Sequence, residues 1–294
     1  MRVLVTGGSG FIGQALTRAL TQRGDQVVIL SRQPGKVPAM TGVVTVDRLQ
    51  AISGKVDAVV NLAGAPIVDK RWSESRKQLL RASRIDLTRD LVSWMQTRDV
   101  PPAVLVSGSA IGYYGSHQDE VLDENAPVAA GFPHELCNAW EQAALVAESA
   151  STRVCLVRTG VVLGPGGALT KMLPPYRLGL GGPIGDGQQW MSWIHLDDEV
   201  GAILYLLDNP SLRGPFNLTA PEPVTNEEFC QTLGKVLKRP AAFRMPAFVM
   251  RLLLGEASEL LLEGQRVVPV HLNSAGYAFK YRTLEPALKA VIKT

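Results

Sequence analysis

The sequence predicts an α/β fold, with a doubly wound parallel sheet and a smaller C-terminal α+β lobe. In roughly the first half of the chain, aliphatic and β-branched runs alternate with amphipathic helical stretches, as expected for a parallel sheet that is buried on both faces. A glycine-rich turn joins the first run to the first helical stretch. After Thr159 the alternation gives way to proline- and glycine-rich segments, which mark the start of the second lobe.

The first strand is expected at 2–6, and glycines at three-residue spacing follow it. An apolar 3.6-residue repeat behind them predicts a helix. In this strand–turn–helix context, bare backbone and the helix N-terminus can bind the pyrophosphate of a dinucleotide. We therefore assign the following residues to a cofactor site: Gly7, Gly10, Phe11, Ile12 and Gly13.

The second strand, expected at 26–31, ends about 20 residues beyond the glycines, where an acidic residue binds the ribose 2′-hydroxyl of NAD. This chain has Ser31 and Arg32 there instead. A carboxylate would repel a 2′-phosphate, whereas a guanidinium can hold one through charge-assisted hydrogen bonds. The sequence therefore predicts NADP as the cofactor.

Further strands are expected at 42–46, 57–62, 103–108 and 154–158, with a long helix over 73–97 and another that begins at Pro133. The glycine-dense loop at 179–187 is expected to act as a lid. Helices are also expected from 194 to 207, at 226–238 and 246–262, and from Leu284 onwards. Charges interrupt the apolar stretch 248–262, which predicts a core helix and not a membrane span.

Ligands of doubly wound sheets bind at the carboxyl ends of the strands. Small residues follow the fourth strand and end the fifth, so we add Leu62, Ala63, Gly64 and Ser107 to the cofactor site. The turn after the fifth strand is expected to overlook the reacting end of the cofactor. It carries the candidate catalytic residues Ser109, Tyr113 and Tyr114.

Composition excludes several classes of function. The net charge is +3 and the basic residues are scattered, so a nucleic-acid surface is not indicated. The three cysteines, an odd number without a Cys-x-x-Cys motif, favour reduced thiols in the cytoplasm over a disulfide framework or a metal site. Because the chain runs from Met1 straight into the first strand, we expect no signal peptide and no membrane partner.

Several strings together resemble the extended short-chain dehydrogenases/reductases. The most similar group is the NADP-dependent "epimerase family" branch, which is related to the proteins named NAD-dependent epimerase/dehydratase. The general strings are Thr6-Gly-Gly-Ser-Gly-Phe-Ile-Gly13, Asn61-Leu-Ala-Gly64, Ser107-Gly-Ser109, Arg158 with Gly164-Pro165, and Trp193-Ile-His-Leu-Asp197. The branch strings are Asp69-Lys-Arg-Trp72, Gly112-Tyr-Tyr-Gly115, Leu136-Cys137 with Trp140-Glu141, Lys171-Met-Leu-Pro-Pro175, Leu178-Gly-Leu-Gly-Gly-Pro183 and Gly264-Gln-Arg-Val267.

The resemblance covers nearly the whole chain and implies a Rossmann domain at 1–160, with a return segment near 190–215. It also implies a substrate lobe formed by 161–189 and 216–294, an NADP cofactor, and relatives that act on sugar-like or nucleotide-linked substrates.

The catalytic pattern departs from the family. Ser109 matches its serine, but the usual Tyr-x-x-x-Lys positions fall at about Pro133 and Cys137, and the earlier asparagine at about Arg84. Proline has no proton to give, and a thiol cannot replace an ammonium. Tyr113 or Tyr114 is the first replacement that we consider. Cys137 is more often a small buried hydrophobe, and His195 more often a structural residue.

Two functions remain open, while Arg32 and the intact glycines argue against a third, a structural or interaction protein that only retains the Rossmann fold. The first is an NADP-dependent oxidoreductase or epimerase with a rearranged catalytic set, acting on an unidentified small molecule that is nucleotide- or sugar-linked in relatives. The second is a non-catalytic NADP(H)-binding sensor or regulatory protein. The missing Tyr-x-x-x-Lys favours the sensor, whereas Ser109 and a full substrate lobe favour the enzyme. A homodimer is considered possible.

Overall fold

The computed structural model describes residues 1–292, and its centre is a seven-stranded sheet in which every neighbouring pair is parallel. The strand order is β11-β7-β5-β4-β1-β2-β3. The chain adds strands to one side of β1 first and then, from β4 onwards, to the other side, and ligands of doubly wound folds bind at this switch point. The predicted doubly wound sheet is confirmed. Its strands are β1 (Arg2–Thr6), β2 (Gln26–Leu30), β3 (Val43–Val46), β4 (Ala58–Asn61), β5 (Val104–Ala110), β7 (Arg153–Thr159) and β11 (Gly214–Leu218).

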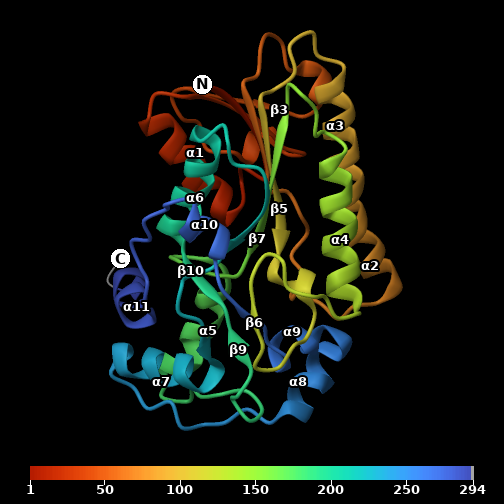
Figure 1. Ribbon diagram of the computed structural model, residues 1–294. Helices are drawn as coiled ribbons and strands as arrows, with labels where there is room; N and C mark the ends of the chain where they lie inside the picture. Colours follow the sequence, from red (N-terminus) through yellow and green to blue (C-terminus); the bar gives the residue numbers. More distant parts are fainter. Residues whose placement is uncertain (293–294) are drawn as a thin grey trace.

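Helices cover both faces of the sheet (Figure 1). On one face lie α1 (Phe11–Gln22) and α6 (Leu196–Asp208), whose Leu16, Leu20 and Ile203 join the strands in one hydrophobic cluster. On the other face lie α3 (Leu87–Gln96) and α4 (Phe132–Leu145), whose apolar residues form a second cluster with the strands. The valines, leucines and alanines of the central strands are buried because both faces are covered.

The second lobe lies beyond the carboxyl ends of the strands (Figure 1). One of its cores brings together α5 (Gly167–Arg177), α7 (Asn226–Leu237) and α11 (Leu284–Ile292) around Phe229 and Trp193. The smaller elements outside the main sheet are α8 (Ala247–Leu254), η5 (Gly255–Ser258), α9 (Glu259–Leu262), α10 (Val270–Ser274) and three strand pairs. These pairs are β8 (Val161–Leu163) with β10 (Trp193–His195), β9 (Trp190–Met191) with β12 (Val224–Thr225), and β6 (Val121–Leu122) with β13 (Arg266–Val267).

The boundary between the lobes differs from the expected one. The return segment extends beyond 215, because β11 pairs with β7 as an edge strand of the main sheet. Leu272 of α10 and Phe279 also pack into the core of the sheet, so part of 216–294 belongs to the Rossmann domain. Residues 293 and 294 of the expected lobe lie outside the described residues.

The helix expected at 73–97 is interrupted. It consists of α2 (Glu74–Arg81), a π-helical turn η3 (Ala82–Asp86) and α3. The Thr88 hydroxyl donates a hydrogen bond of 2.6 Å to the Arg84 carbonyl at this turn. Turns of this kind are frequent at functional sites, and the apolar periodicity of the sequence does not reveal them.

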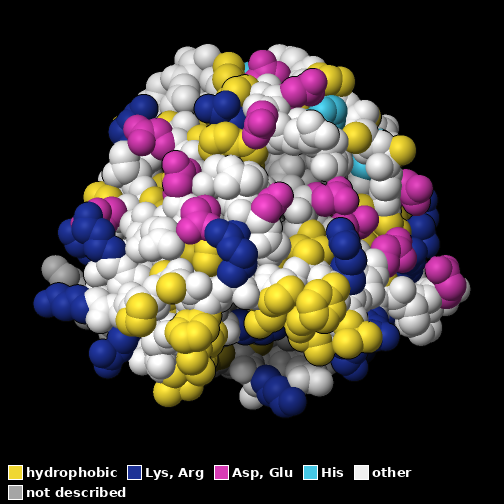
Figure 2. Space-filling view, turned by 90° about the horizontal axis from the view of Figure 1, so that it is seen from below, with side chains coloured by type: hydrophobic (Ala, Val, Ile, Leu, Met, Phe, Trp, Pro, Cys, Tyr) yellow, Lys and Arg dark blue, Asp and Glu magenta, His cyan; other side chains and the backbone are white. Residues whose placement is uncertain are grey.

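The prediction of a core helix over the apolar stretch 248–262 is wrong. That segment forms α8, η5 and α9, and α8 contains no buried residue. Phe248, Leu252 and Leu253 are 67, 67 and 59% exposed. Figure 2 looks at this end of the molecule and shows hydrophobic side chains gathered on the surface. Apolar composition alone does not show whether another element covers a helix.

Candidate functional site at the carboxyl edge of the sheet

The turn between β1 and α1 needs glycine for two separate reasons. A Cβ on Gly7 (φ +69°) would lie 2.7 Å from the Leu62 carbonyl, and one on Gly13 would lie 2.2 Å from the Gly7 oxygen. These two glycines therefore allow close packing of the protein itself. A Cβ on Gly10 would meet only the Gly7 oxygen, at 3.1 Å, so Gly10 leaves its exposed side bare for a ligand.

The N-terminus of α1 suits an anion. Gly10 is the N-cap and provides no side-chain cap, and the first turn has no acidic residue. Within residues 1–292, the N–H groups of Phe11 and Ile12 have no recorded acceptor. Unpaired N–H groups at the positive end of a helix dipole form a ready site for a phosphate. The five residues assigned to this turn are thus brought together in a geometry that fits a dinucleotide pyrophosphate.

The Phe11 ring connects the turn with the second lobe. Cβ atoms added to Gly164, Gly166 and Gly167 would lie 2.7, 2.7 and 3.0 Å from atoms of this ring. The glycines after β8 therefore let the chain pass directly against the ring. The contact could not be predicted from the sequence, because Phe11 and these glycines lie about 150 residues apart.

Ser31 and Arg32 follow β2, whose Leu30 is in register with Thr6 of β1, so both lie beside the glycine turn. Ser31 accepts a hydrogen bond of 3.2 Å from the Gln33 N–H. Arg32 is exposed and forms no ion pair with any described residue. Its position at the edge of the sheet is the one expected for a residue that binds a 2′-phosphate.

The loop after β4 is held against the glycine turn by buried polar groups. Thr6 donates to the Asn61 side chain at 2.6 Å and accepts from the Ala63 N–H at 3.2 Å. Leu62 and Ala63 are half-buried and Gly64 is exposed, so the backbone of this loop is available beside the turn. Ser107 is wholly buried and accepts a bond of 3.4 Å from the Asn61 amide. The Ser107 side chain therefore supports Asn61 from inside the core.

The hydroxyl of Ser109 is already engaged. It is buried at the end of β5 and donates to the Glu141 carboxylate at 2.6 Å. Glu141 in turn receives two hydrogen bonds of 2.9 Å from the Arg158 guanidinium. Burial opposes the charge on Arg158, but the hydrogen bonds and charge of Glu141 more than offset it and raise the pKa of Arg158. Both residues belong to strings that carry the family resemblance, but the sequence did not show that they form a buried pair.

The two tyrosines differ in their surroundings. Tyr114 is completely buried, donates to the Asn217 side chain at 2.6 Å and accepts from Arg158 at 3.0 Å. Burial raises the pKa of Tyr114 to about 12. This corrects the expectation for Tyr114, whose phenol lies in the core. Tyr113 is half-buried, with its ring centroid 3.5 Å from the Arg158 guanidinium carbon, and its hydroxyl has no recorded protein partner among the described residues.

The residues at the positions of the missing tyrosine and lysine cannot donate a proton in catalysis at neutral pH. Pro133 lies in the first turn of α4, and Cys137 is buried on the same helix. Burial raises the pKa of the Cys137 thiol to about 12. His195 is buried as well, and its Nδ1 accepts the Asp197 N–H at 3.0 Å, which caps α6. His195 therefore caps α6, as expected for a structural residue.

Glu199 was missed by the sequence analysis. It lies on α6 with no exposed surface, and it accepts a hydrogen bond of 2.9 Å from Thr159, at the end of β7. Its other carboxylate oxygen has no hydrogen-bond partner, and burial raises the pKa of Glu199 to about 8. A carboxyl group with this pKa stays protonated at neutral pH.

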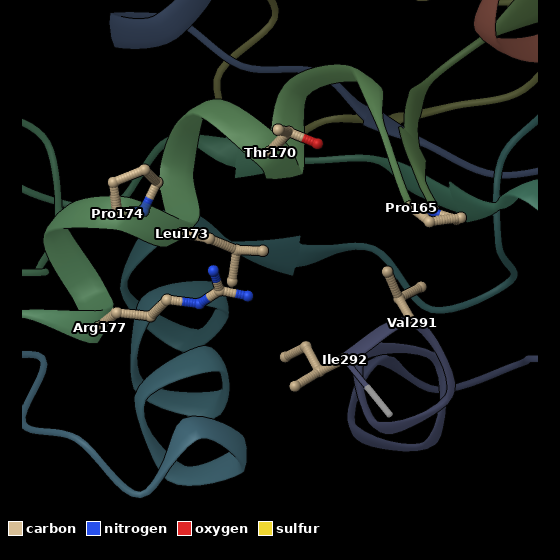
Figure 3. Close-up of a pocket in the computed structure, with 8 residues that line it drawn as sticks. Pro165, Thr170, Leu173, Pro174, Arg177, Val291 and Ile292 are labelled. Atoms are coloured by element: carbon tan, nitrogen blue, oxygen red, sulfur yellow. The ribbon is translucent and has the colours of Figure 1, made fainter. Parts of the chain in front are cut away.

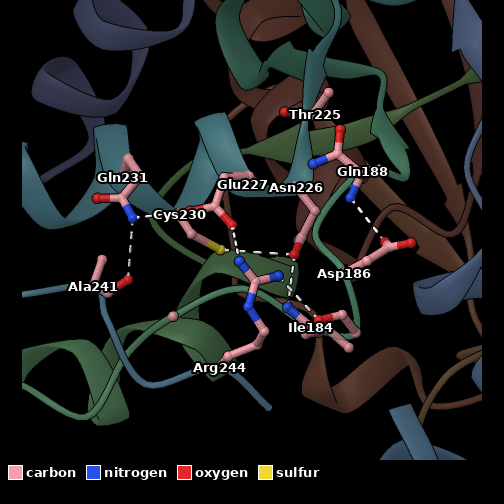
Figure 4. A network of polar contacts seen from close by, with 12 residues as sticks. Ile184, Asp186, Gln188, Thr225, Asn226, Glu227, Cys230, Gln231, Ala241 and Arg244 are labelled. Carbon is pink, nitrogen blue, oxygen red and sulfur yellow. Dashed lines mark hydrogen bonds and ion pairs between the residues drawn. The ribbon is translucent and has the colours of Figure 1, made fainter. Parts of the chain in front are cut away.

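The glycine-dense loop at 179–187 is not a free lid. Its backbone bonds to the segment around Phe243 and Met245, and the Glu227 N–H donates to the Gly187 carbonyl at 2.8 Å. The Arg244 guanidinium donates to the Glu227 carboxylate at 2.6 Å, as Figure 4 shows for the two side chains. It also donates to the Gly185 carbonyl at 3.0 Å. The glycines are needed for close packing: a Cβ on Gly182 would lie 2.4 Å from the Phe243 oxygen. Partners distant in sequence thus fix a loop whose composition predicted mobility.

Two clefts lie away from the Ser109 edge. One, of about 370 Å³, lies between α5 and α11 and is lined by Leu173, Arg177 and Val291 (Figure 3). The other, of about 560 Å³, lies between α1, α6 and the C-terminal segment. Within residues 1–292 there is no group of three or more side chains placed to hold a metal ion, and no helix is long and apolar enough to cross a membrane.

Comparisons with known proteins agree with this geometry. The sequence model of the NAD dependent epimerase/dehydratase family matches residues 3–218, and that of a domain of unknown function, DUF1731, matches residues 245–291. The chain is 43% identical to the "epimerase family protein SDR39U1 homolog, chloroplastic" of Arabidopsis thaliana, over 100% of this chain and 87% of the relative. It is 41% identical to the human epimerase family protein SDR39U1, over 99% of this chain and 100% of that protein.

Solved structures agree as well. A crystal structure of human SDR39U1 with NADPH matches with a TM-score of 0.93 at 39% identity, covering 100% of this chain and 99% of that one. The nucleoside-diphosphate sugar epimerase from Corynebacterium glutamicum matches with a TM-score of 0.78 at 30% identity, covering 99% of this chain and 58% of that one. On the match over residues 3–218 and the full-length relatives, the chain belongs to the NAD dependent epimerase/dehydratase family.

Proposed function

We propose that this chain is an NADP(H)-binding oxidoreductase or epimerase that acts on a small molecule with a catalytic set other than Tyr-x-x-x-Lys. The observation that carries the proposal is the bare N-terminus of α1, with its uncapped N–H groups beside Arg32. This edge provides donors for a pyrophosphate and a cation for a 2′-phosphate. The NADPH in the human SDR39U1 crystal supports the same cofactor here.

Within this proposal, Ser109 and Tyr113 remain the catalytic candidates. The Ser109 hydroxyl donates a hydrogen bond to Glu141, but its oxygen can still accept a hydrogen bond from a substrate hydroxyl. Tyr113 is the phenol near Ser109 that has no recorded protein partner among the described residues. If an activity is found, Ser109→Ala should lower kcat by about 10²-fold, as expected for a positioned acid/base group. The affinity for NADPH should hardly change.

The nature of the cofactor can be tested at Arg32. Arg32→Ala should weaken NADP binding by roughly 1.5–3 kcal/mol, the contribution of a hydrogen bond to a charged group, and leave NAD binding nearly unchanged. Titration calorimetry with both cofactors provides the measurement. An equal loss for both cofactors would show that Arg32 does not recognise the 2′-phosphate.

The second candidate, a non-catalytic NADP(H) sensor, is favoured by the state of the residues at the candidate catalytic positions. Ser109 is tied to Glu141, Tyr114 is in the core and the pKa of Cys137 is about 12. A screen of the NADPH-loaded protein against carbonyl compounds and nucleotide sugars separates the two functions. Oxidation of NADPH, followed at its absorbance, or conversion of a compound into its epimer by the NADP⁺-loaded protein, supports the enzyme. Unchanged NADPH together with unchanged compounds supports the sensor. The cytoplasmic location and a homodimer remain predictions.

A further inference from the structure

Two arginines bind consecutive carbonyls of the loop that follows β4. Arg84, in the π-helical turn, donates to the Ala65 carbonyl at 3.0 Å, and Arg76, on α2, donates to the Pro66 carbonyl. The two positive charges are close enough that Arg76 contributes to lowering the pKa of Arg84, after the larger effect of burial. This pair of like charges therefore lies directly beside the edge of the sheet.

Neither guanidinium has an acidic partner. The neighbouring cations are paired, Lys77 with Glu256 and Arg81 with Glu135, but within residues 1–292 Arg76 and Arg84 form no ion pair. The Nε of Arg76 is buried without an acceptor. The other contacts of Arg84, to the Leu80 carbonyl and the Ser83 hydroxyl, are 3.4 and 3.5 Å long. A guanidinium has five N–H donors, so most of these donors lack a strong acceptor.

Arg84 also lies at the right place for a ligand that reacts with the cofactor. A Cβ on Gly64 would lie 2.9 Å from the Arg84 guanidinium carbon, and Gly64 belongs to the predicted cofactor site. The same guanidinium stacks on the Trp140 ring, at 5.4 Å from its centroid. Trp140 in turn covers Gly108, which precedes Ser109. The arginine thus lies at the edge formed by the ends of β4 and β5.

We propose that Arg76 and Arg84 together bind an anionic group of the substrate, a carboxylate or a phosphate, beside the nicotinamide end of the cofactor. The proposal rests on the proposed function, because it places the substrate next to NADP(H). Both arginines are half-buried. Two adjacent guanidiniums without a carboxylate are costly to remove from water even in part, and an anion with several acceptor oxygens offsets that cost. An arginine that only holds loop carbonyls does not need to be partly buried. Arg71, for example, binds the carbonyls of Leu252 and Leu253 while it is exposed to solvent.

The test titrates the protein, saturated with NADP⁺, with inorganic pyrophosphate in one arm and malonate in the other, at constant ionic strength. Saturation with cofactor keeps the probes away from the N-terminus of α1. We expect the wild type to bind at least one probe, and the stronger arm identifies the group as phosphate or carboxylate. Arg84→Met and Arg76→Met should each weaken probe binding about tenfold or more, a loss expected for a charge-assisted contact.

The matched control is Arg89→Met, an exposed arginine on α3 that is paired with Asp86, and it should leave probe binding unchanged. Arg84→Lys keeps the charge with fewer donors and should give intermediate binding, which also covers the case in which Arg84→Met does not fold. NADPH affinity should change less than twofold in all variants.

Three results would overturn the proposal: no probe binding by the wild type, equal binding by the arginine variants, or a parallel loss of NADPH affinity. NADPH binding by the wild type is measured first. Its absence would refute the proposed function. The probe titrations would then be run on the cofactor-free protein, and their outcome would still decide the role of the arginine pair.

Discussion

The two halves of the carboxyl edge of the sheet differ in how their polar groups are satisfied. Beyond the ends of β1 and β2, the N–H groups of Phe11 and Ile12 and the Arg32 side chain have no protein partner among the described residues. At the ends of β5 and β7, by contrast, side chains satisfy one another through Ser109, Glu141 and Arg158. The first half is prepared for a ligand with many acceptors. In the second half a substrate must compete with, or make use of, hydrogen bonds that already exist.

The largest effect is expected at the buried pair. Glu141→Ala would leave the Arg158 guanidinium in the core without its carboxylate and should reduce the free energy of unfolding by about 3–5 kcal/mol. Urea unfolding provides the measurement. Glu141→Gln, which keeps an acceptor, should lose less. A loss below about 1 kcal/mol for Glu141→Ala would mean that water replaces the pair and that the two halves do not differ as described.

The next effect concerns the open half. Gly10→Val should lower NADPH affinity by about 100-fold or more while the protein stays folded, since a Cβ there meets only one protein atom, at 3.1 Å. Gly13→Ala is the contrasting variant, and should destabilise the fold because its Cβ would lie 2.2 Å from the Gly7 oxygen. Fluorescence titration and thermal unfolding distinguish the two. Retained NADPH binding in folded Gly10→Val would show that the turn does not hold the pyrophosphate.

A pH dependence is expected from Glu199 of α6, which accepts a hydrogen bond from Thr159 at the end of β7. Burial raises the pKa of this carboxyl from 4.5 to about 8 in the folded protein, so folding takes up a proton between these values. Its contribution to stability is therefore fully present below about pH 4.5 and is lost as the pH rises towards 8, with a slope of up to about 1.4 kcal/mol per pH unit. Glu199→Gln should have a flatter stability profile over this range. Parallel profiles for the variant and the wild type would contradict the assignment.

The smallest effect separates the two tyrosines. Tyr114→Phe removes a buried hydroxyl that bonds to Asn217 and Arg158, and should cost about 1–3 kcal/mol of unfolding free energy. Tyr113→Phe should change stability by less than about 0.5 kcal/mol, because its hydroxyl has no recorded protein partner in the part of the chain that the structure describes. Equal losses of stability would mean that the Tyr113 hydroxyl is also held by the fold.

The contrast between the two halves also explains which features were predictable. The strand, glycine turn and helix at 2–22 are adjacent in sequence, and each glycine has a local or backbone reason to be there. The Glu141–Arg158 pair depends on how α4 packs against β7, and the π-helical turn at Arg84 has no sequence period of its own. The exposure of α8 and the fixed loop at 179–187 likewise depend on neighbours distant in sequence.

The most direct test of the account is a titration of the wild-type protein with NADPH and with NADH under identical conditions. The bare N-terminus of α1 predicts binding of a dinucleotide, and Arg32 predicts at least tenfold tighter binding of NADPH, which corresponds to about 1.4 kcal/mol. Binding of neither cofactor, or equal affinity for both, would contradict the central claim that this half of the edge is an NADP(H) site.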